Sequence, residues 1–309
     1  MENKQSLFSL KCNNNNNLIL STPSKYKFDE SVICSESEFK YRICELFSYF
    51  KDFDWTNVMF AGGLLSAMME QKYDPINFAR SDIDLFITDS KDYERVYNYF
   101  KSKFNKVYSF GYLYSNVINI ITPEFNRSIQ LIGLFDSKNK KTFESFEDVL
   151  KGFDLSHCQI GFTGNNIIYT DEFMNTMKNR ISTISGGKVH AYRIVKAIQR
   201  GYSIAAPTQN IFVKNYFSNY TDIKVPGLNH TDKFRDIKNL DLSELIGNTI
   251  VQKNLNKYYI PKKSESDEQV FKKISDVFPN PIIIKNNNLN FAKEKDIYLN
   301  KRGMTCFHK

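Results

Sequence analysis

The chain has 309 residues, of which 41% are hydrophobic and 25% charged, so it can bury the core of one large domain or of two ordinary ones. Its formal net charge of +8 suits a polyanionic or phosphorylated partner, and it equally suits a chain made lysine-rich by biased coding. The absence of a bilayer-length apolar run, of a signal-peptide core and of a disulfide or zinc pattern among the five cysteines leads us to expect a cytoplasmic protein without membrane association.

The N-terminal segment, residues 1–34, is polar throughout and contains a run of asparagines at 13–17. Such a run cannot bury an apolar face, so we expect a loop or a flexible segment here. The first helix is expected to begin at Ser35, because Ser35 and Glu38 fit a capping box and apolar residues follow at helical spacing.

Short apolar runs and helical patterns alternate after residue 56. We expect strands at 57–62, 82–87, 106–114, 116–122 and 128–135, a hairpin over 152–170, and helices at 64–71, 90–104 and 142–150. The sequence therefore predicts an α/β (α+β) catalytic domain over 35–175, with a mixed, twisted sheet of about five strands flanked by helices. Residues 176–309 are expected to form a helical and irregular C-terminal region.

Two glycines and two aspartates stand out in this pattern. Gly62 and Gly63 lie at the expected strand-to-helix turn, where glycine lets the backbone approach a phosphate closely. Asp82 and Asp84 are separated by one residue in the next strand, so their carboxylates lie on the same face, about 6–7 Å apart. An oxygen-seeking cation can bridge this distance. The plain alternative is a tight turn followed by the polar start of a strand.

In this order and context, the glycine pair and the Asp-x-Asp strand resemble the DNA polymerase β-like nucleotidyltransferase superfamily, which includes poly(A) polymerase-like members. The resemblance covers roughly residues 57–170, with helical support to about 205. The arginine-rich motif that tRNA CCA-adding enzymes carry after the acidic pair is not visible, which argues against that subgroup.

The resemblance implies a nucleotidyltransferase-like fold and the transfer of a nucleoside monophosphate from an NTP, with two Mg²⁺ or Mn²⁺ ions. Asp82 and Asp84 would be catalytic and hold the metal ions. We expect Asp154 to be the third catalytic and metal-binding carboxylate, because it begins an apolar stretch after a helix. The rival strand offers only Gln130, which would weaken the second metal site if it occupies that place.

The resemblance also implies contacts with the nucleotide. The nucleotide-binding residues that we expect are Gly62, Gly63, Ser66, Arg193, Lys196 and Arg200. The three cations share one face of a helix and would neutralise a triphosphate or an RNA backbone, although a solvated face explains them equally well. A loop at 71–80, between the glycines and the aspartates, is expected to cover the site.

The expected partners are an NTP and RNA or another nucleic acid, with an RNA 3′ end as the acceptor. One alternative is a protein or small-molecule acceptor, as in an AMP-transferring toxin. The other is a catalytically weak nucleic-acid-binding module. A nucleic-acid partner predicts basic groups beside Asp82 and Asp84, whereas a small acceptor predicts a closed acidic cleft. The sequence does not indicate an oligomeric state.

Overall fold

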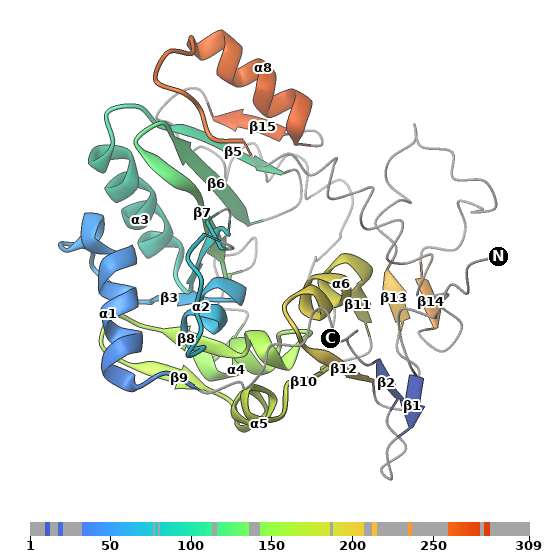
Figure 1. The fold of residues 1–309 in the computed structure, drawn as a ribbon. Helices are drawn as coiled ribbons and strands as arrows, with labels where there is room; N and C mark the ends of the chain where they lie inside the picture. Colours follow the sequence, from blue (N-terminus) through green and yellow to red (C-terminus); the bar gives the residue numbers. More distant parts are fainter. Residues whose placement is uncertain are drawn as a thin grey trace, which may run out of the picture.

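The computed structural model describes residues 10–12, 18–20, 33–76, 78–79, 81–112, 116–135, 143–185, 188–206, 212–214, 234–236, 259–278 and 281–284. These residues form a mixed α+β fold in which one large sheet has helices on both sides and two smaller sheets lie beside it (Figure 1). No helix in the described ranges is long and apolar enough to cross a membrane.

The large sheet has eight strands. In order across the sheet they are β15 (Pro281–Ile284), β5 (Tyr108–Tyr112), β6 (Val117–Thr122), β7 (Phe125–Gly133), β4 (Ile83–Ile87), β3 (Val58–Ala61), β8 (Ile160–Phe162) and β9 (Ile167–Tyr169). Neighbouring strands are antiparallel except for the parallel pair β4 and β7. The expectation of about five strands was wrong, because the expected hairpin pairs with β3 and because β15 pairs with β5.

Two long helices cover one face of this sheet. α1 (Glu36–Leu46) and α3 (Ser90–Lys103) lie along one side of the sheet, on the left in Figure 1. The residues that belong to the main apolar core with them include Phe39, Ile43, Val96, Phe100, Ile83, Leu85 and Ile87, all at most 2% exposed. The opposite face of β4 is therefore the one that is left for polar side chains.

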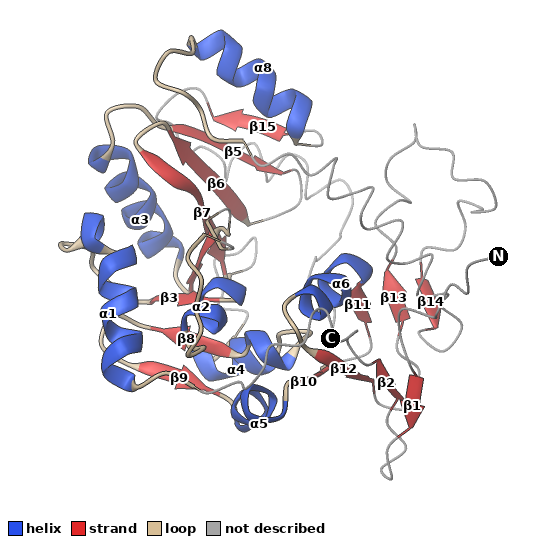
Figure 2. Cartoon of the chain, in the orientation of Figure 1, coloured by secondary structure: helices blue, strands red, loops and turns tan. Residues whose placement is uncertain are grey.

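Helices also lie on the opposite side of the sheet, as Figure 2 shows. They are α4 (Phe146–Lys151) and α6 (Ala191–Gln199), with α8 (Asp267–Val277) at the β15 end. Val149 of α4 packs with Met59 and Ala61 of β3, whereas Val270 of α8 packs with Phe110 of β5. These two apolar clusters border a stretch of the sheet face between them.

The remaining elements are connections within the domain and the strands of the two smaller sheets. They are α2 (Gly63–Met68), the 3₁₀ turns η2 (Ser48–Phe50) and η3 (Ser156–Cys158), α5 (Asp171–Asn179), and the strands β1 (Leu10–Cys12), β2 (Leu18–Leu20), β10 (Ile181–Thr183), β11 (Lys188–His190), β12 (Ser203–Ala206), β13 (Phe212–Lys214) and β14 (Phe234–Asp236). One small sheet has the order β1-β2-β12-β10 and the other β11-β13-β14.

Three expectations at the ends of the chain are corrected by this topology. The N-terminal segment contributes β1 and β2, which pair with β12, although its asparagines at 13–17 lie outside the described residues. The region expected to be helical and irregular from residue 176 has a strand directly after α6, which ends at Gln199, because Gly201 takes a positive φ of 85° and β12 follows. The C-terminal region contains α8 and β15, which complete the edge of the large sheet.

Candidate active site

The side chains of β4 alternate between the core and the bordered sheet face. Ile83 and Leu85 are 0% exposed, whereas Asp82 and Asp84 are only partly buried and lie on the other face. In the register of the sheet, Asp84 stands between Ala61 of β3 and Gln130 of β7. The structure therefore places the two carboxylates together on one face, as the sequence predicted.

The two glycines form the turn from β3 into α2, directly beside Asp84. Gly62 has a φ of 103°, and a Cβ added to it would lie 3.0 Å from Oδ2 of Asp84. A Cβ added to Gly63 would lie 2.2 Å from Nη1 of Arg200, which donates to the Gly63 carbonyl oxygen at 3.4 Å. The backbone thus passes between a carboxylate and a guanidinium, and a side chain on either glycine would press against one of these two groups.

Replacing Gly63 with alanine tests the contact with Arg200. The new methyl group displaces the guanidinium, which ends a flexible side chain, and alanine suits the first turn of α2. We expect apparent NTP affinity to fall about tenfold, or about 1.4 kcal/mol, with less than about 1 kcal/mol lost from the free energy of unfolding. Gly152→Ala, at the end of α4, is the control. Normal NTP binding by folded Gly63→Ala would contradict a role for Arg200.

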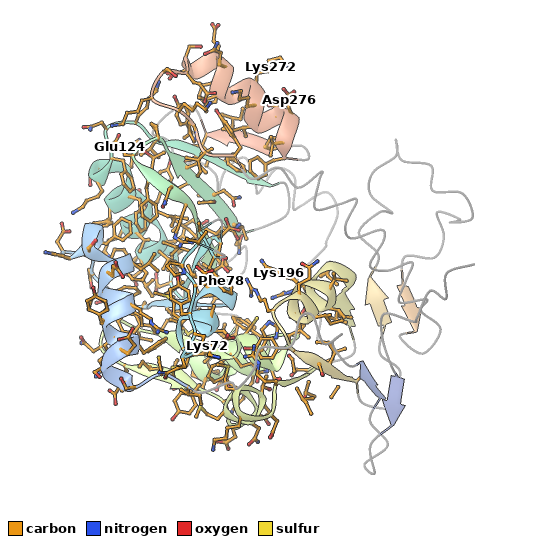
Figure 3. The ribbon with its side chains drawn as sticks, viewed as in Figure 1. Lys72, Phe78, Glu124, Lys196, Lys272 and Asp276 are labelled. Atoms are coloured by element: carbon orange, nitrogen blue, oxygen red, sulfur yellow. The ribbon has the colours of Figure 1, made fainter. Side chains whose placement is uncertain are left out.

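Three cations of α6 act on the carboxylates of β4. Lys196, Arg193 and Arg200 each lower the pKa of Asp84, and Lys196 also lowers that of Asp82. Figure 3 labels Lys196 on α6 and Phe78 near α2, and the Arg200 guanidinium lies 4.9 Å from the centre of the Phe78 ring. The cationic face of α6 is therefore directed at the acidic pair.

Burial opposes the ionisation of both carboxylates in spite of these cations. Burial, and then the charge of Asp84, raises the pKa of Asp82 to about 7. Burial raises the pKa of Asp84 to about 6, against the lowering effect of the three α6 cations. Two neighbouring carboxylates that resist ionisation gain stability from a bound cation, so this donor pair fits a divalent metal ion.

These raised pKa values predict that the protein without metal loses stability as pH rises. Between about pH 4 and pH 7 the folded state binds more protons than the unfolded state, so the free energy of unfolding falls across this window and levels off above it. We expect a fall of about 2–4 kcal/mol, discounted for partial exposure and coupling of the pair. The measurement is urea unfolding in a chelator at several pH values.

The double variant Asp82→Asn, Asp84→Asn is the control for this pH dependence. It lacks both of these titrating groups, so the fall of its unfolding free energy over the same window should be smaller than in the wild type. Equal slopes in the wild type and in this variant would show that other groups set the pH dependence.

The structure distinguishes the two residues that were candidates for the place of a third metal-binding side chain, Asp154 and Gln130. Asp154 was expected to begin a strand, but it precedes the 3₁₀ turn η3 instead. Its Oδ1 lies 3.3 Å from Nη1 of Arg193. Gln130 stands beside Asp84 in the sheet, and its Nε2 donates to Oδ2 of Asp82 at 3.4 Å. Within the described residues, no group of three His, Cys, Asp or Glu side chains is arranged to hold a metal ion. The position next to the pair is thus occupied by a neutral amide.

Ser66 lies away from the acidic pair. Its side chain is 2% exposed, and its hydroxyl bonds with the Tyr202 hydroxyl, so it is not available to a phosphate in this arrangement. Tyr202 also donates to Oε1 of Glu70 at 2.9 Å, and Arg180 joins the same oxygen at 2.9 Å and the Arg200 carbonyl oxygen at 2.9 Å. This network ties the end of α6 to the end of α2, which positions Arg200 beside Gly63.

Sequence reasoning missed Arg127, a nearly buried residue of β7. Its Nη1 donates to the carbonyl oxygens of Phe78 and Ser81, which fixes the chain immediately before β4, and its charge lowers the pKa of Asp82. The available signal was that Arg127 is the only charged residue in β7. Phe78 also brings the described part of the loop at 71–80 against Arg200.

Comparison with known proteins adds one family match and several partial likenesses. Residues 37–180 match a family model described as "Gad2: Gabija anti-defense 2 family protein". "Uncharacterized protein R883" of Acanthamoeba polyphaga mimivirus is 23% identical over 260 residues, which are 76% of this chain and 53% of that protein. The chain therefore spans about half the length of this curated relative.

Three solved structures with partial similarity carry the names of tRNA-processing and CCA-adding enzymes. A "tRNA-processing enzyme (apo form I)" is 9% identical, with a TM-score of 0.33 over 54% of this chain and 42% of that one. A tRNA-processing enzyme with CTP is 10% identical, with a TM-score of 0.31 over 45% and 36%. The Bacillus stearothermophilus CCA-adding enzyme in complex with CTP is 14% identical, with a TM-score of 0.29 over 52% and 36%.

Proposed function

We propose that this protein transfers a nucleoside monophosphate from an NTP to an acceptor hydroxyl. The observation that carries the proposal is the meeting of three features at one place on the sheet. They are the acidic pair Asp82 and Asp84, a glycine turn that contacts Asp84, and the cationic face of α6. Carboxylates that fit a metal ion, beside cations that fit phosphates, are what a nucleotide triphosphate needs.

Asp82 and Asp84 are the residues that would hold a divalent ion. Mg²⁺ is commonly bound by one or two carboxylates together with substrate phosphates, so a pair without a third acid suits an ion that arrives with the nucleotide. When bound, the ion orients the triphosphate and stabilises the charge that develops on the α-phosphate. The expectation of two ions stays a prediction, because the neighbouring Gln130 offers a neutral oxygen only.

The reaction is an in-line displacement at the α-phosphorus. The acceptor oxygen forms a new bond to this phosphorus, and the bond to the bridging oxygen breaks, so that pyrophosphate leaves with the electron pair. Arg200 and Lys196 would neutralise the leaving pyrophosphate, and the Gly62–Gly63 turn leaves room for the phosphates. The acceptor proton passes to solvent.

An RNA 3′ end is the acceptor that we favour. Among the described groups, four cations act electrostatically on the pair: Arg127, Arg193, Lys196 and Arg200. A small acceptor predicts a closed acidic cleft instead of such a basic surrounding. A net charge of +8 favours the approach of a polyanion.

A second candidate shares the chemistry but not the acceptor. The family model that matches residues 37–180 is described as anti-defense, which favours transfer onto a component of a defence system, including a protein hydroxyl. The anti-defense interpretation predicts that a defence-system protein is labelled in preference to RNA.

The test is incubation of the purified chain with each of the four α-labelled NTPs, Mg²⁺ or Mn²⁺, and either a short RNA or a mixture of proteins. Label that enters RNA and is lost with the Asp84→Asn variant supports the proposal with its favoured acceptor. Label that enters protein supports the second candidate. No label on any acceptor and no release of pyrophosphate would contradict nucleotidyl transfer altogether.

A further inference from the structure

Two amide side chains extend the site beyond the acidic pair. Asp84 of β4 is paired in register with Gln130 of β7, which is paired with Asn119 of β6. Residues that are directly paired across strands point to the same face, so the three side chains form one row. We call Gln130 and Asn119 the amide row. Since strands are about 4.8 Å apart, it reaches about 10 Å from Asp84.

The far member of the row is an unpartnered donor. Asn119 is 2% exposed, and its Nδ2 has no hydrogen-bond partner in the part of the chain that the structure describes. Buried amide groups are normally paired, because an unpaired one destabilises the fold. Past Asn119 the face turns apolar, where the tilted rings of Phe110 and Phe278 pack with their centres 4.4 Å apart. The donor therefore stands at the closed end of the row, and Gln130, which is partly exposed, stands at the open end.

The direction of the proposed displacement indicates on which side of Asp84 the acceptor enters. The groups that would hold the phosphates, Gly63 and Arg200, lie on the β3 side of Asp84, whereas the amide row lies on the β7 side. In an in-line displacement the attacking oxygen enters opposite the leaving group. The pyrophosphate leaves on the β3 side, so the acceptor enters over the amide row.

We propose that the amide row is the acceptor subsite and that Asn119 donates a hydrogen bond to the hydroxyl next to the attacking one, as in the vicinal diol of a terminal ribose. This proposal rests on the proposed function and names its acceptor class. Gln130, whose Nε2 is engaged by Asp82, borders the attacking hydroxyl, and Asn119 receives the neighbouring 2′-hydroxyl. The 2′-hydroxyl is the group by which proteins distinguish RNA from DNA at a given position.

The experiment compares two RNAs of the same sequence, one ending in a ribose and one in a 2′-deoxyribose with its 3′-hydroxyl intact. The readout is kcat/KM for nucleotide transfer by the full chain. We expect the wild type to prefer the ribose end by about 10- to 100-fold, the value of one hydrogen bond to a buried donor. In Asn119→Val and Asn119→Ala this preference should fall to within about threefold, because activity on the ribose end drops and activity on the deoxyribose end is retained.

Stability supplies the second readout and guards against a misfolded variant. Asn119→Val removes an unpaired buried amide and places a β-branched residue in a strand, so its unfolding midpoint should equal or exceed that of the wild type. Ser109→Ala is the matched control, because Ser109 is 3% exposed on the opposite face of β5 and should leave the preference unchanged.

The outcomes separate this proposal from the proposed function. A wild type that uses both RNA ends equally, or a preference that survives in Asn119→Val, overturns the acceptor subsite and leaves nucleotidyl transfer standing. Transfer to protein alone overturns the ribose assignment in the same way. A failure to transfer nucleotide to any acceptor overturns the proposed function, and the subsite falls with it.

Discussion

Replacing Asp84 with asparagine is expected to lower nucleotide transfer by roughly three orders of magnitude, or about 4 kcal/mol in the activation barrier. Asn keeps the shape of the side chain, so the sheet and the contact with Gly62 stay in place, while the charge that a divalent ion needs is removed. Because burial already opposes the charge of Asp84, the variant without metal should also be more stable than the wild type at pH 8. Transfer assays and urea unfolding at that pH measure the two effects.

Asp52→Asn is the matched control for this substitution. Asp52 pairs with Lys103 at 2.8 Å, at the end of α3 on the opposite side of the sheet, and its side chain is 67% exposed. Loss of a surface ion pair changes stability by less than about 1 kcal/mol, and transfer should be unaffected. Asp82→Asn is expected to behave like Asp84→Asn. Full activity in either variant, with the fold intact, would contradict the assignment of the pair as the metal-binding site.

The features of the site that were predictable from the sequence are those that depend on local periodicity. Asp82 and Asp84 share a face because side chains in a strand alternate, and the apolar Ile83 and Leu85 determine which face is buried. The turn at Gly62 was predictable because an apolar run ends there and a helical pattern follows. The common face of Arg193, Lys196 and Arg200 follows in the same way from the helical repeat.

The parts that were not predictable depend on contacts between distant segments. Sequence does not indicate that β15, from residues 281–284, pairs with β5, and this pairing with α8 closes the end of the face beyond Asn119. The register that aligns Asp84, Gln130 and Asn119 also depends on the pairing of three strands, which no single-strand pattern contains.

At two further positions a local pattern was interpreted without its tertiary partner. Ser66 lies one helical turn after the glycines, but Tyr202, from more than 130 residues along the chain, takes its hydroxyl. Asp154 looks like the start of a strand, but Leu155 forms only an isolated bridge with Ile184, and the chain then turns through η3. In both cases the competing contact comes from the segment that contains α5, α6 and β12.

Substituting Arg193, Lys196 and Arg200 together with glutamine is expected to weaken apparent NTP affinity by about 100-fold, or about 2.7 kcal/mol. The physical reason is that all three charges act on Asp84, and that Arg200 also contacts the glycine turn, so the group they best fit is a triphosphate bound beside the pair. The control is Lys40→Gln, Lys51→Gln, Lys91→Gln, which removes the same charge from exposed positions on the α1 and α3 side.

RNA binding measured against salt concentration distinguishes this interpretation from its rival. If the α6 cations hold the triphosphate, the slope of log affinity against log salt for a single-stranded RNA stays the same in the triple variant. If they bind RNA phosphates instead, the slope falls by about 0.7 for each phosphate that is no longer neutralised, while NTP affinity is retained. A triple variant that changes neither quantity would show that the face of α6 is solvated. Phosphate binding beside Asp84 would then rest on the glycine turn alone.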